Sequence, residues 1–229
     1  MALRDRLAHV APTPDPQKKE PSKRGRTARV SRERILDAAL KEFAENGFEG
    51  ATTASVARRV GVTQPLIHYH FGSKLALWRA AVELAFNRMG SLLQGIEEDM
   101  QRVDPSLALR TLVRRFVYFN AKHPEIGRLI VSESSSDTPR LEWMTEQHIR
   151  PMFAHVSMLL QAGGETGTLK KLPAESVLFA FLGAVPHYFD AAPLIRKLYG
   201  FNPLDPQRVD AHAETVVEIF AAGLLSDDE

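Results

Sequence analysis

The sequence predicts an all-α protein, and three observations support this. Apolar residues recur at three- and four-residue spacing along most of the 229-residue chain. No segment shows the two-residue alternation that is typical of a half-buried strand. Several periodic stretches begin after a Ser, Thr or Asp and end at a Gly, as helices commonly do. With 44% apolar residues, the chain can also bury a core.

Composition narrows the class of protein further. Cysteine is absent, which excludes disulfides and thiolate chemistry. No apolar run approaches the roughly 20 residues that a membrane-spanning helix needs. The N-terminus is polar and proline-rich, unlike the apolar stretch of a signal peptide. We therefore expect a cytoplasmic protein with no membrane partner.

The net charge of +1 conceals a strong asymmetry along the chain. Residues 1–80 hold fifteen Lys/Arg against eight Asp/Glu, whereas residues 81–229 hold fourteen against twenty. A basic segment at one end indicates a polyanionic partner there. A solvated basic tail on an ordinary protein would give the same counts, so charge alone does not decide.

Residues 1–29 are predicted to form a disordered basic arm. Four prolines and six Lys/Arg lie between residues 12 and 29, and apolar periodicity stops after Leu7. Lys23, Arg24 and Arg26 form a compact basic step within this arm. Such arms can lie in a minor groove or along phosphates, and the alternative is a solubilising tail without fixed contacts.

Residues 30–75 are predicted to form three short helices. The first is capped by Ser31 and ends at Asn46-Gly47. The second is capped by Thr52 or Thr53 and ends at Gly61, where only glycine bends without strain. The third follows Thr63, and Pro65 in its first turn is harmless because those amides have no helical partner.

Two short helices joined by a tight turn match the helix-turn-helix plan. Leu66 and Ile67 form the apolar back of the second helix. Its outward face is polar, small or aromatic, and comprises Gln64, Pro65, His68, Tyr69 and His70. A glutamine can donate to and accept from a base edge, and a proline can contact a thymine methyl. Tyr69 and His70 suit phosphate or sugar contacts, and Arg58, Arg59 and Lys74 on flanking helices are expected to neutralise backbone charge.

The stretch from Ile35 to Leu77 resembles the DNA-binding domain of the tetracycline-repressor (TetR/AcrR) family. The resemblance rests on these motif pieces in order: Ala38-Ala39-Leu40, Phe43, Asn46-Gly47-Phe48, Thr52, Val56-Ala57, Gly61-Val62-Thr63, Tyr69-His70-Phe71 and Ser73-Lys74. About fifty residues match strongly, and the remainder matches only by length and helical pattern.

The resemblance implies a homodimeric repressor that a small molecule releases from double-stranded DNA. It further implies that the last two helices of each subunit pair in a four-helix bundle. By position, it assigns helix caps near phosphates to Thr52 and Thr63, base contacts to Gln64 and Pro65, and a phosphate contact to Lys74. Thr53, His68, Tyr69 and His70 complete the expected DNA-binding set, together with the arm residues.

Two departures from the family pattern bear on DNA recognition. His68 stands where tyrosine is usual, which predicts a weaker or pH-sensitive contact. Ala54 stands where some members have a base-reading arginine, so the second helix is expected to read less of the sequence.

Residues 76–229 are predicted to form a helical domain for ligand binding and dimerisation. Ser73 is expected to cap a long helix, Pro151 to kink another, and Gly163, Gly164 and Gly167 to form a turn. The helices around 177–189 and 209–224 are expected to pair across a two-fold axis. A mostly apolar effector is expected, in a pocket that includes Phe116, Phe119, Asn120, His123, Trp143, Met144, His148, Met152, Phe153 and His187. Plain core packing is the alternative for each of these residues.

Other chemistries have weaker support in the sequence. His68 and His70 are two apart on a helix and point in different directions, so we expect no metal there. His187 and Asp190 are three apart, but a structural pair is favoured over a metal or proton site. No cofactor is expected. The competing functions are a helical-bundle enzyme or carrier with the N-terminal segment as scaffold, and an adaptor that binds acidic proteins through its arm.

Overall fold

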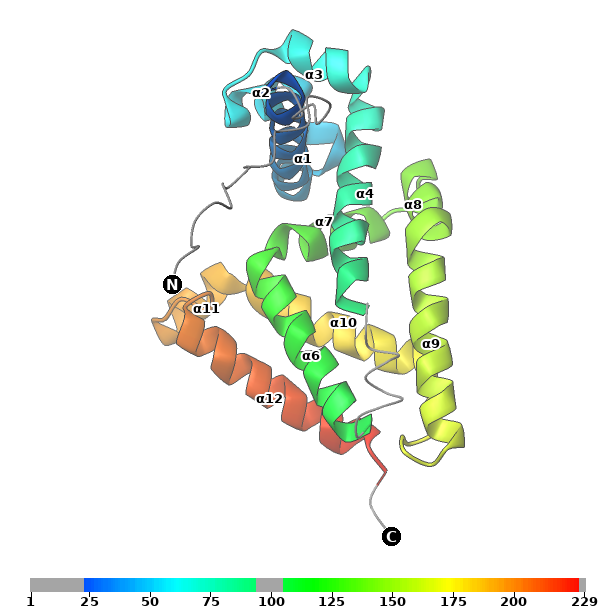
Figure 1. Ribbon diagram of the computed structural model, residues 1–229. Coiled ribbons are helices and arrows are strands. Elements are labelled where there is room, and N and C mark those ends of the chain that lie inside the picture. Colours follow the sequence, from blue (N-terminus) through cyan, green and yellow to red (C-terminus); the bar gives the residue numbers. More distant parts are fainter. Residues whose placement is uncertain (1–22, 94–104, 227–229) are drawn as a thin grey trace, which may run out of the picture.

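The computed structural model describes residues 23–93 and 105–226, and every regular element in these ranges is a helix (Figure 1). This confirms the all-α prediction, with an isolated bridge between Leu169 and Leu225 as the only β-type pairing in the described ranges. The elements are α1 (Lys23–Gly50), α2 (Thr53–Val60), α3 (Gln64–Phe71), α4 (Lys74–Leu93), α6 (Pro105–Lys122), α7 (Pro124–Ser134), α8 (Pro139–Met144), a π-helical turn (Thr145–Ile149), α9 (Arg150–Glu165), α10 (Ala174–Asp190), α11 (Ala192–Tyr199) and α12 (Pro206–Leu224).

Helix α1 begins earlier than the sequence predicted. It starts at Lys23, so the expectation of a disordered arm is wrong for residues 23–29, and Ser31 lies inside a helix rather than at its cap. The three arm residues Lys23, Arg24 and Arg26 therefore lie on the first turns of α1, and no acidic residue occupies its first turn. Residues 1–22 lie outside the described residues.

The predicted end of the first helix is confirmed at Gly47. This residue has φ 64° and ψ 177°, which interrupts α1 and redirects the chain. The redirected Phe48 stacks on Phe43 at a centroid distance of 6.0 Å and meets the edge of Trp78. The glycine thus returns an aromatic ring to the core, as its place in the sequence indicated.

The turn between α2 and α3 also forms as predicted. Thr52 caps α2, its side chain accepts from the Ser55 amide, and Ser55 reciprocates to the Thr52 amide in a capping box. Gly61 ends α2 in the left-handed conformation with φ 71°. Thr63 occupies the cap position of α3 but forms no side-chain capping bond.

Helix α4 connects the N-terminal three-helix unit (α1–α3) to the rest of the molecule. The Ser73 hydroxyl accepts from the Ala76 amide at 3.1 Å, as expected of a cap. Leu77, Trp78, Ala81 and Val82 are fully buried, and the same core continues into α7 and α8 through Ile126, Leu129 and Met144. One hydrophobic core therefore unites the three-helix unit with α4, α7 and α8.

The predicted kink at Pro151 appears as a change of helix type. Thr145–Ile149 forms a π-helical turn, and Pro151 then lies in the first turn of α9. Proline lacks the amide that an interior position would need, so the chain widens just before it. The π-helical turn carries His148 inward against α4, where its ring stacks on Phe86 at 4.8 Å.

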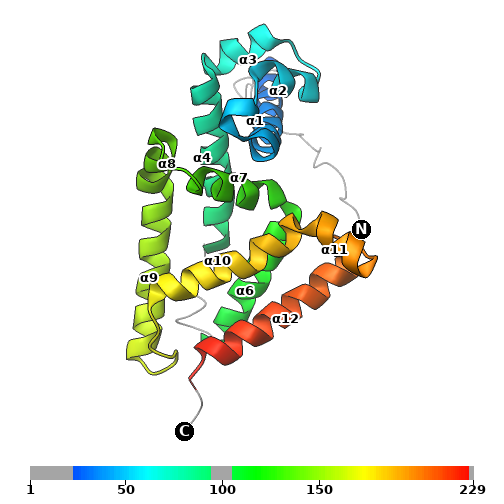
Figure 2. The ribbon, with the colours of Figure 1, turned by 180° about the vertical axis from the view of Figure 1, so that it is seen from behind.

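A second core lies among α6, α10 and α12, which Figure 2 shows from the side of α10 and α12. Its buried members are Val113, Val117, Val185, Phe189, Val209, Ala213, Val216 and Val217. Two ion pairs, from Arg110 to Glu218 and from Arg114 to Glu214, and a hydrogen bond from Tyr118 to Asp210 join α6 to α12 on the exposed side.

Two local predictions in this part are corrected. Gly163 and Gly164 belong to α9, and only Gly167, at φ 78°, has turn geometry. Gly163 is needed because a Cβ there would lie 2.5 Å from a methyl of Leu169, which folds back over α9. The short helix α11 was not predicted, because its eight residues give little apolar period and only Ala191 separates it from α10.

No single helix in the described ranges is long and apolar enough to cross a membrane, although α10 and α11, bent by 66°, meet the length and composition criteria as a pair.

Candidate functional site

Helix α3 presents the side chains that the sequence assigned to an outward face. Gln64, Pro65 and His68 are exposed, and Tyr69 is 83% exposed, the most of any large hydrophobic residue described. Ile67 on the opposite side is buried, whereas Leu66 is half-buried. His70 is half-buried, with its ring edge-on to Tyr69 at 5.4 Å. An exposed aromatic beside exposed polar groups on an anchored helix is suited to contact a large partner.

The threonines at the start of α2 lie next to this face. Thr52 is exposed, although the capping box occupies its side chain. The Thr53 hydroxyl accepts a hydrogen bond from the Gln64 amide nitrogen at 3.1 Å, which links α2 to α3 across the turn. The structure therefore brings Thr53 and Gln64 together, a contact that their spacing of eleven residues did not reveal.

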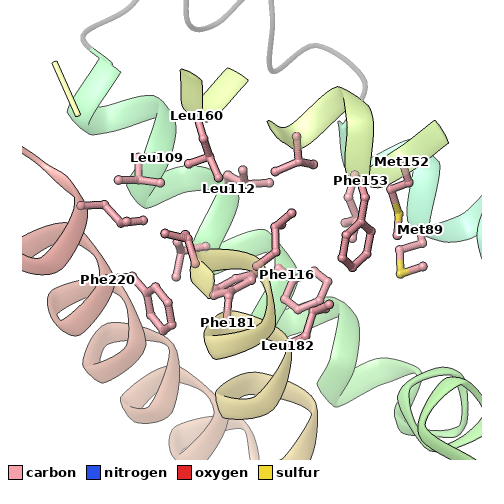
Figure 3. Close-up of a pocket in the computed structure, with 16 residues that line it drawn as sticks. Met89, Leu109, Leu112, Phe116, Met152, Phe153, Leu160, Phe181, Leu182 and Phe220 are labelled. Carbon is pink, nitrogen blue, oxygen red and sulfur yellow. The ribbon is translucent and has the colours of Figure 1, made fainter. Parts of the chain in front are cut away.

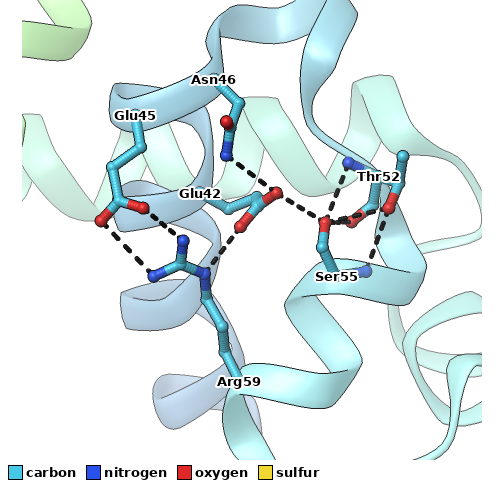
Figure 4. A network of polar contacts seen from close by, with 6 residues as sticks. All are labelled: Glu42, Glu45, Asn46, Thr52, Ser55 and Arg59. Carbon is cyan, nitrogen blue, oxygen red and sulfur yellow. Dashed lines mark hydrogen bonds and ion pairs between the residues drawn. The ribbon is translucent and has the colours of Figure 1, made fainter.

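A polar network fixes α2 on α1 (Figure 4). The buried Glu42 carboxylate accepts from the Ser55 hydroxyl at 2.6 Å, from the Arg59 guanidinium at 2.6 Å and from the Asn46 amide at 3.1 Å. Arg59 also pairs with Glu45. Burial alone would raise the pKa of Glu42, but the bonds from Ser55, Arg59 and Asn46 together hold that pKa below its ordinary value.

This network corrects the role expected of Arg59. Its guanidinium is committed to two carboxylates of α1, so it fixes the tilt of α2 rather than offering a free charge. Its neighbour Arg58 is exposed, and remains available to an external anion.

Lys74 lies at the start of α4, close to the end of α1. Its ammonium donates to the Glu49 carbonyl at 3.1 Å and lies 4.7 Å from the centre of the Phe48 ring. Arg140 of α8 contacts the same ring at 4.1 Å and pairs with Glu133 and Glu49. Phe48 thus holds together a lysine of α4 and an arginine of α8.

An apolar cavity of about 120 Å³ lies between the two cores (Figure 3). Helices α4, α6, α9, α10 and α12 line it, and no side-chain nitrogen or oxygen belongs to the lining residues. These are Met89, Leu92, Leu109, Leu112, Val113, Phe116, Met152, Phe153, Val156, Leu160, Val177, Leu178, Phe181, Leu182, Phe220 and Leu224. Met89 and Met152 lie side by side at one end, where α4 meets α9.

Few of the residues predicted to form a pocket line this cavity. Phe116, Met152 and Phe153 do so, whereas Phe119, Asn120, His123, Trp143, Met144, His148 and His187 do not line it, and their part in ligand binding stays a prediction. The polar members are otherwise engaged: the Asn120 amide donates to the Phe116 carbonyl, His123 contacts Glu125, and His187 is exposed. The helical period of the sequence predicted which helix faces are aromatic. It did not predict which of those faces border the cavity.

His148 and its neighbours belong instead to the contact between α4 and α8. Its ring stacks on Phe86 and meets the edge of Trp143 at 5.2 Å, and Trp143 lies 5.5 Å from Trp78. Burial lowers the pKa of His148, against a smaller opposite effect of Glu83. This aromatic cluster adjoins the cavity, because Met152 and Met89, which line the cavity, each follow a residue of the cluster by about one turn. Met152 follows His148, and Met89 follows Phe86.

The structure also places the candidates for metal binding. Asp190 pairs with Arg128 at 3.4 Å, and burial raises the pKa of its carboxyl. Within residues 23–93 and 105–226, no group of three His, Cys, Asp or Glu side chains is arranged to hold a metal ion.

An anchored helix-turn-helix at one end and an apolar cavity beside its connecting helix define a DNA-binding regulator with a ligand domain. Comparison with known proteins agrees. Residues 35–81 match the family described as bacterial regulatory proteins, tetR family, and residues 105–219 match the tetracyclin repressor-like C-terminal domain. The chain therefore belongs to the TetR family of transcriptional regulators, which excludes the helical-bundle enzyme or carrier.

Individual relatives match over most of their length. The HTH-type transcriptional regulator RutR of Escherichia coli strain K12 is 25% identical over 90% of this chain and 96% of its own. The HTH-type transcriptional repressor NicS of Pseudomonas putida is 28% identical over 65% of this chain and 68% of its own. The fold is similar to that of FadR from Bacillus subtilis in complex with stearoyl-CoA, with a TM-score of 0.60, 17% identity, and 83% and 98% of the two chains covered. Regulators of this family bind DNA and small-molecule effectors and are usually dimers.

Proposed function

We propose that this regulator is a cytoplasmic, homodimeric repressor, released from a near-palindromic operator by a mostly apolar small molecule. The observation that carries the proposal is the pairing of an exposed polar face on α3 with a wholly apolar cavity on α4. A dimer would place its two copies of α3 about 34–36 Å apart, in successive major grooves. The similarity to NicS, a transcriptional repressor, supports the repressor role.

The DNA-contacting set follows from exposure and chemistry. Gln64 and Pro65, at the exposed start of α3, would contact base edges. Tyr69 and His70, with His68 beside them, would contact sugar and phosphate, as would Thr52, Thr53 and Thr63 at the two helix starts. Lys74 would neutralise a phosphate, and Lys23, Arg24 and Arg26 would add positive charge from the start of α1.

Dimerisation is assigned to α10 and α12, which lie on one face of the larger part of the molecule (Figure 2). Each has an exposed large apolar side chain, Phe179 at 67% and Ile219 at 63%. Small residues of the same two helices are exposed as well, namely Ala180, Gly183, Ala184, Ala211, Ala222 and Gly223. Such a face allows close approach of a second copy, and burial of both copies would remove apolar surface from water.

The effector class follows from the lining of the cavity. A lining without polar atoms cannot satisfy a buried polar group, so the inserted part of the effector must be hydrocarbon or aromatic. The present volume is below the roughly 300–1,000 Å³ of typical ligand sites, so a larger effector must displace side chains. Met89 and Met152 are flexible enough to move, and movement of Met89 would act directly on α4. The similar fold of a regulator solved with stearoyl-CoA supports a lipid-like compound.

Replacing Gln64 by Ala is expected to weaken operator binding by about 1–3 kcal/mol and to relax base choice, because a base-edge contact is lost. Lys74→Ala should weaken all duplexes alike and reduce the salt dependence of binding. Both are measured by titrating the full chain against operator and random duplexes at several salt concentrations. An unchanged preference for operator in Gln64→Ala would contradict the assignment.

Replacing Leu182 by Trp is expected to fill the cavity and make DNA binding insensitive to apolar compounds. Primary alcohols from butanol to dodecanol should raise the melting temperature of the unmodified protein progressively, since each buried methylene contributes about 0.8 kcal/mol. The variant should lose this progression. Met158→Trp is the control, because Met158 lies on α9 but is exposed and outside the lining. Equal responses in both variants would exclude the cavity as the effector site.

A further inference from the structure

The hydrogen bond between Thr53 of α2 and Gln64 of α3 concerns how α2 takes part in base selection. Position 54 is Ala, so α2 has no long side chain there to reach a base. The Thr53 hydroxyl nevertheless accepts from the Gln64 amide nitrogen at 3.1 Å, on the side of the unit where α3 presents its exposed face. We infer that Thr53 is a positioning residue, which orients the Gln64 amide so that it prefers adenine to guanine. The inference rests on the proposed role of Gln64 in base reading.

Both ends of this contact are anchored in the backbone. Thr53 is the first residue of α2, directly after the capping box of Thr52 and Ser55. The Ser55 hydroxyl also donates to buried Glu42, which ties this turn to α1. Gln64 is the first residue of α3, with Pro65 restricting the turn behind it. The hydroxyl and the amide therefore meet with little freedom left in either chain segment.

The consequence for base choice follows from counting donors. A glutamine amide has two N–H donors and one carbonyl acceptor. When one N–H is given to Thr53, one donor and the carbonyl remain. Adenine offers N7 as acceptor and its N6 amino group as donor in the major groove, which matches this pair. Guanine offers two acceptors, N7 and O6, and would need both N–H groups.

The same bond connects base reading to the DNA backbone. A hydroxyl that accepts from Gln64 still has its own hydrogen to donate. Thr53 lies at the N-terminus of α2, where amide groups and the helix dipole favour a phosphate. A phosphate oxygen that accepts from Thr53 would complete a chain from the backbone through the hydroxyl to the base-reading amide.

The test is selection of bound sequences from a randomised pool of duplex DNA, with the full chain. We expect wild type to enrich a near-palindrome with adenine at the position whose preference Gln64→Ala removes. Thr53→Val, which keeps the shape but removes the hydroxyl, should reduce the adenine-to-guanine ratio there about threefold to tenfold. Thr53→Ser should restore that ratio, because it restores the acceptor. Thr53→Ala tests the same loss without a β-branched side chain, and melting temperatures confirm that each variant folds.

Three results would overturn the inference. The ratio could stay at the wild-type value in Thr53→Val and Thr53→Ala, these variants could weaken every duplex equally as a phosphate contact alone predicts, or wild type could select guanine. The proposed function fails in a separate way. If wild type enriched no motif, or Gln64→Ala left the motif unchanged, base reading by α3 would be wrong whatever Thr53 does, and the inference would fall with it.

Discussion

Replacing Trp78 by Ala is expected to lower the free energy of unfolding by about 3–5 kcal/mol, the largest change that we expect of a single substitution in this chain. Trp78 is fully buried in the core that unites the three-helix unit with α7 and α8, and its ring contacts Phe48 of α1 and Trp143 of α8. The truncation would leave a cavity bordered by rigid rings, which cannot collapse to fill it. Operator binding should fall as well, because Phe48 would lose its support.

Urea unfolding of the full chain measures this effect. Trp78→Phe should lose less than half as much, since its indole nitrogen has no hydrogen-bond partner in the described part of the chain and only ring size is lost. Tyr69→Ala is the matched control, because it removes an aromatic ring that is 83% exposed and should change stability by less than about 0.5 kcal/mol. A loss under about 1 kcal/mol in Trp78→Ala would contradict the united core.

Replacing Arg59 by Ala should lower the free energy of unfolding by about 2–3 kcal/mol. The Glu42 carboxylate is buried, and without its guanidinium partner it would keep only the Ser55 and Asn46 bonds. This loss is smaller than that for a fully buried pair, because the Arg59 side chain is 35% exposed and water screens it. Arg58→Ala removes an equal charge from the same helix at an exposed position and should have little effect.

Acid should remove the same stabilisation. Since the native state holds the pKa of Glu42 below its ordinary value, the unfolded chain binds a proton first as pH falls. The contribution is therefore complete above the unfolded pKa of about 4.3 and is lost as pH falls through the lower native value. Unfolding curves between about pH 6 and pH 3 should show a smaller acid slope in Glu42→Gln than in wild type. Equal slopes would show that Glu42 is not the responsible carboxyl.

The N-terminal three-helix unit was predictable because its constraints are local. The Thr52 cap, a left-handed Gly61 and the early Pro65 each determine backbone shape within a few residues, and the structure confirms these three. The start of α1 was missed because nothing local marks it: the arm lacks apolar periodicity, yet its residues continue a helix that later residues nucleate.

The cavity was less predictable because it depends on how distant helices meet. Its lining draws on five helices, and period alone does not tell which apolar side chains meet neighbours and which border a void. The Glu42–Arg59 pair lies seventeen residues apart, and no local pattern indicated that Arg59 would turn toward α1 rather than solvent. Glu42, the partner of Arg59 on α1, is one of only three buried polar or charged residues in the described ranges. Its importance could be recognised only once its burial was known.

The continuous core has a practical consequence for protein engineering. A chimera that joins α1–α3 of this regulator to the sensory part of a relative would separate Phe48 of α1 from Trp78 of α4 and Arg140 of α8, on which it packs. In this chain, Ile126, Leu129, Arg140 and Met144 form the surfaces on which the α1–α3 unit and α4 rest. The graft should succeed only if the relative's sensory part has matching surfaces or is altered to provide them. Specificity and sensing in this chain are therefore exchangeable as matched sets of residues rather than as separate modules.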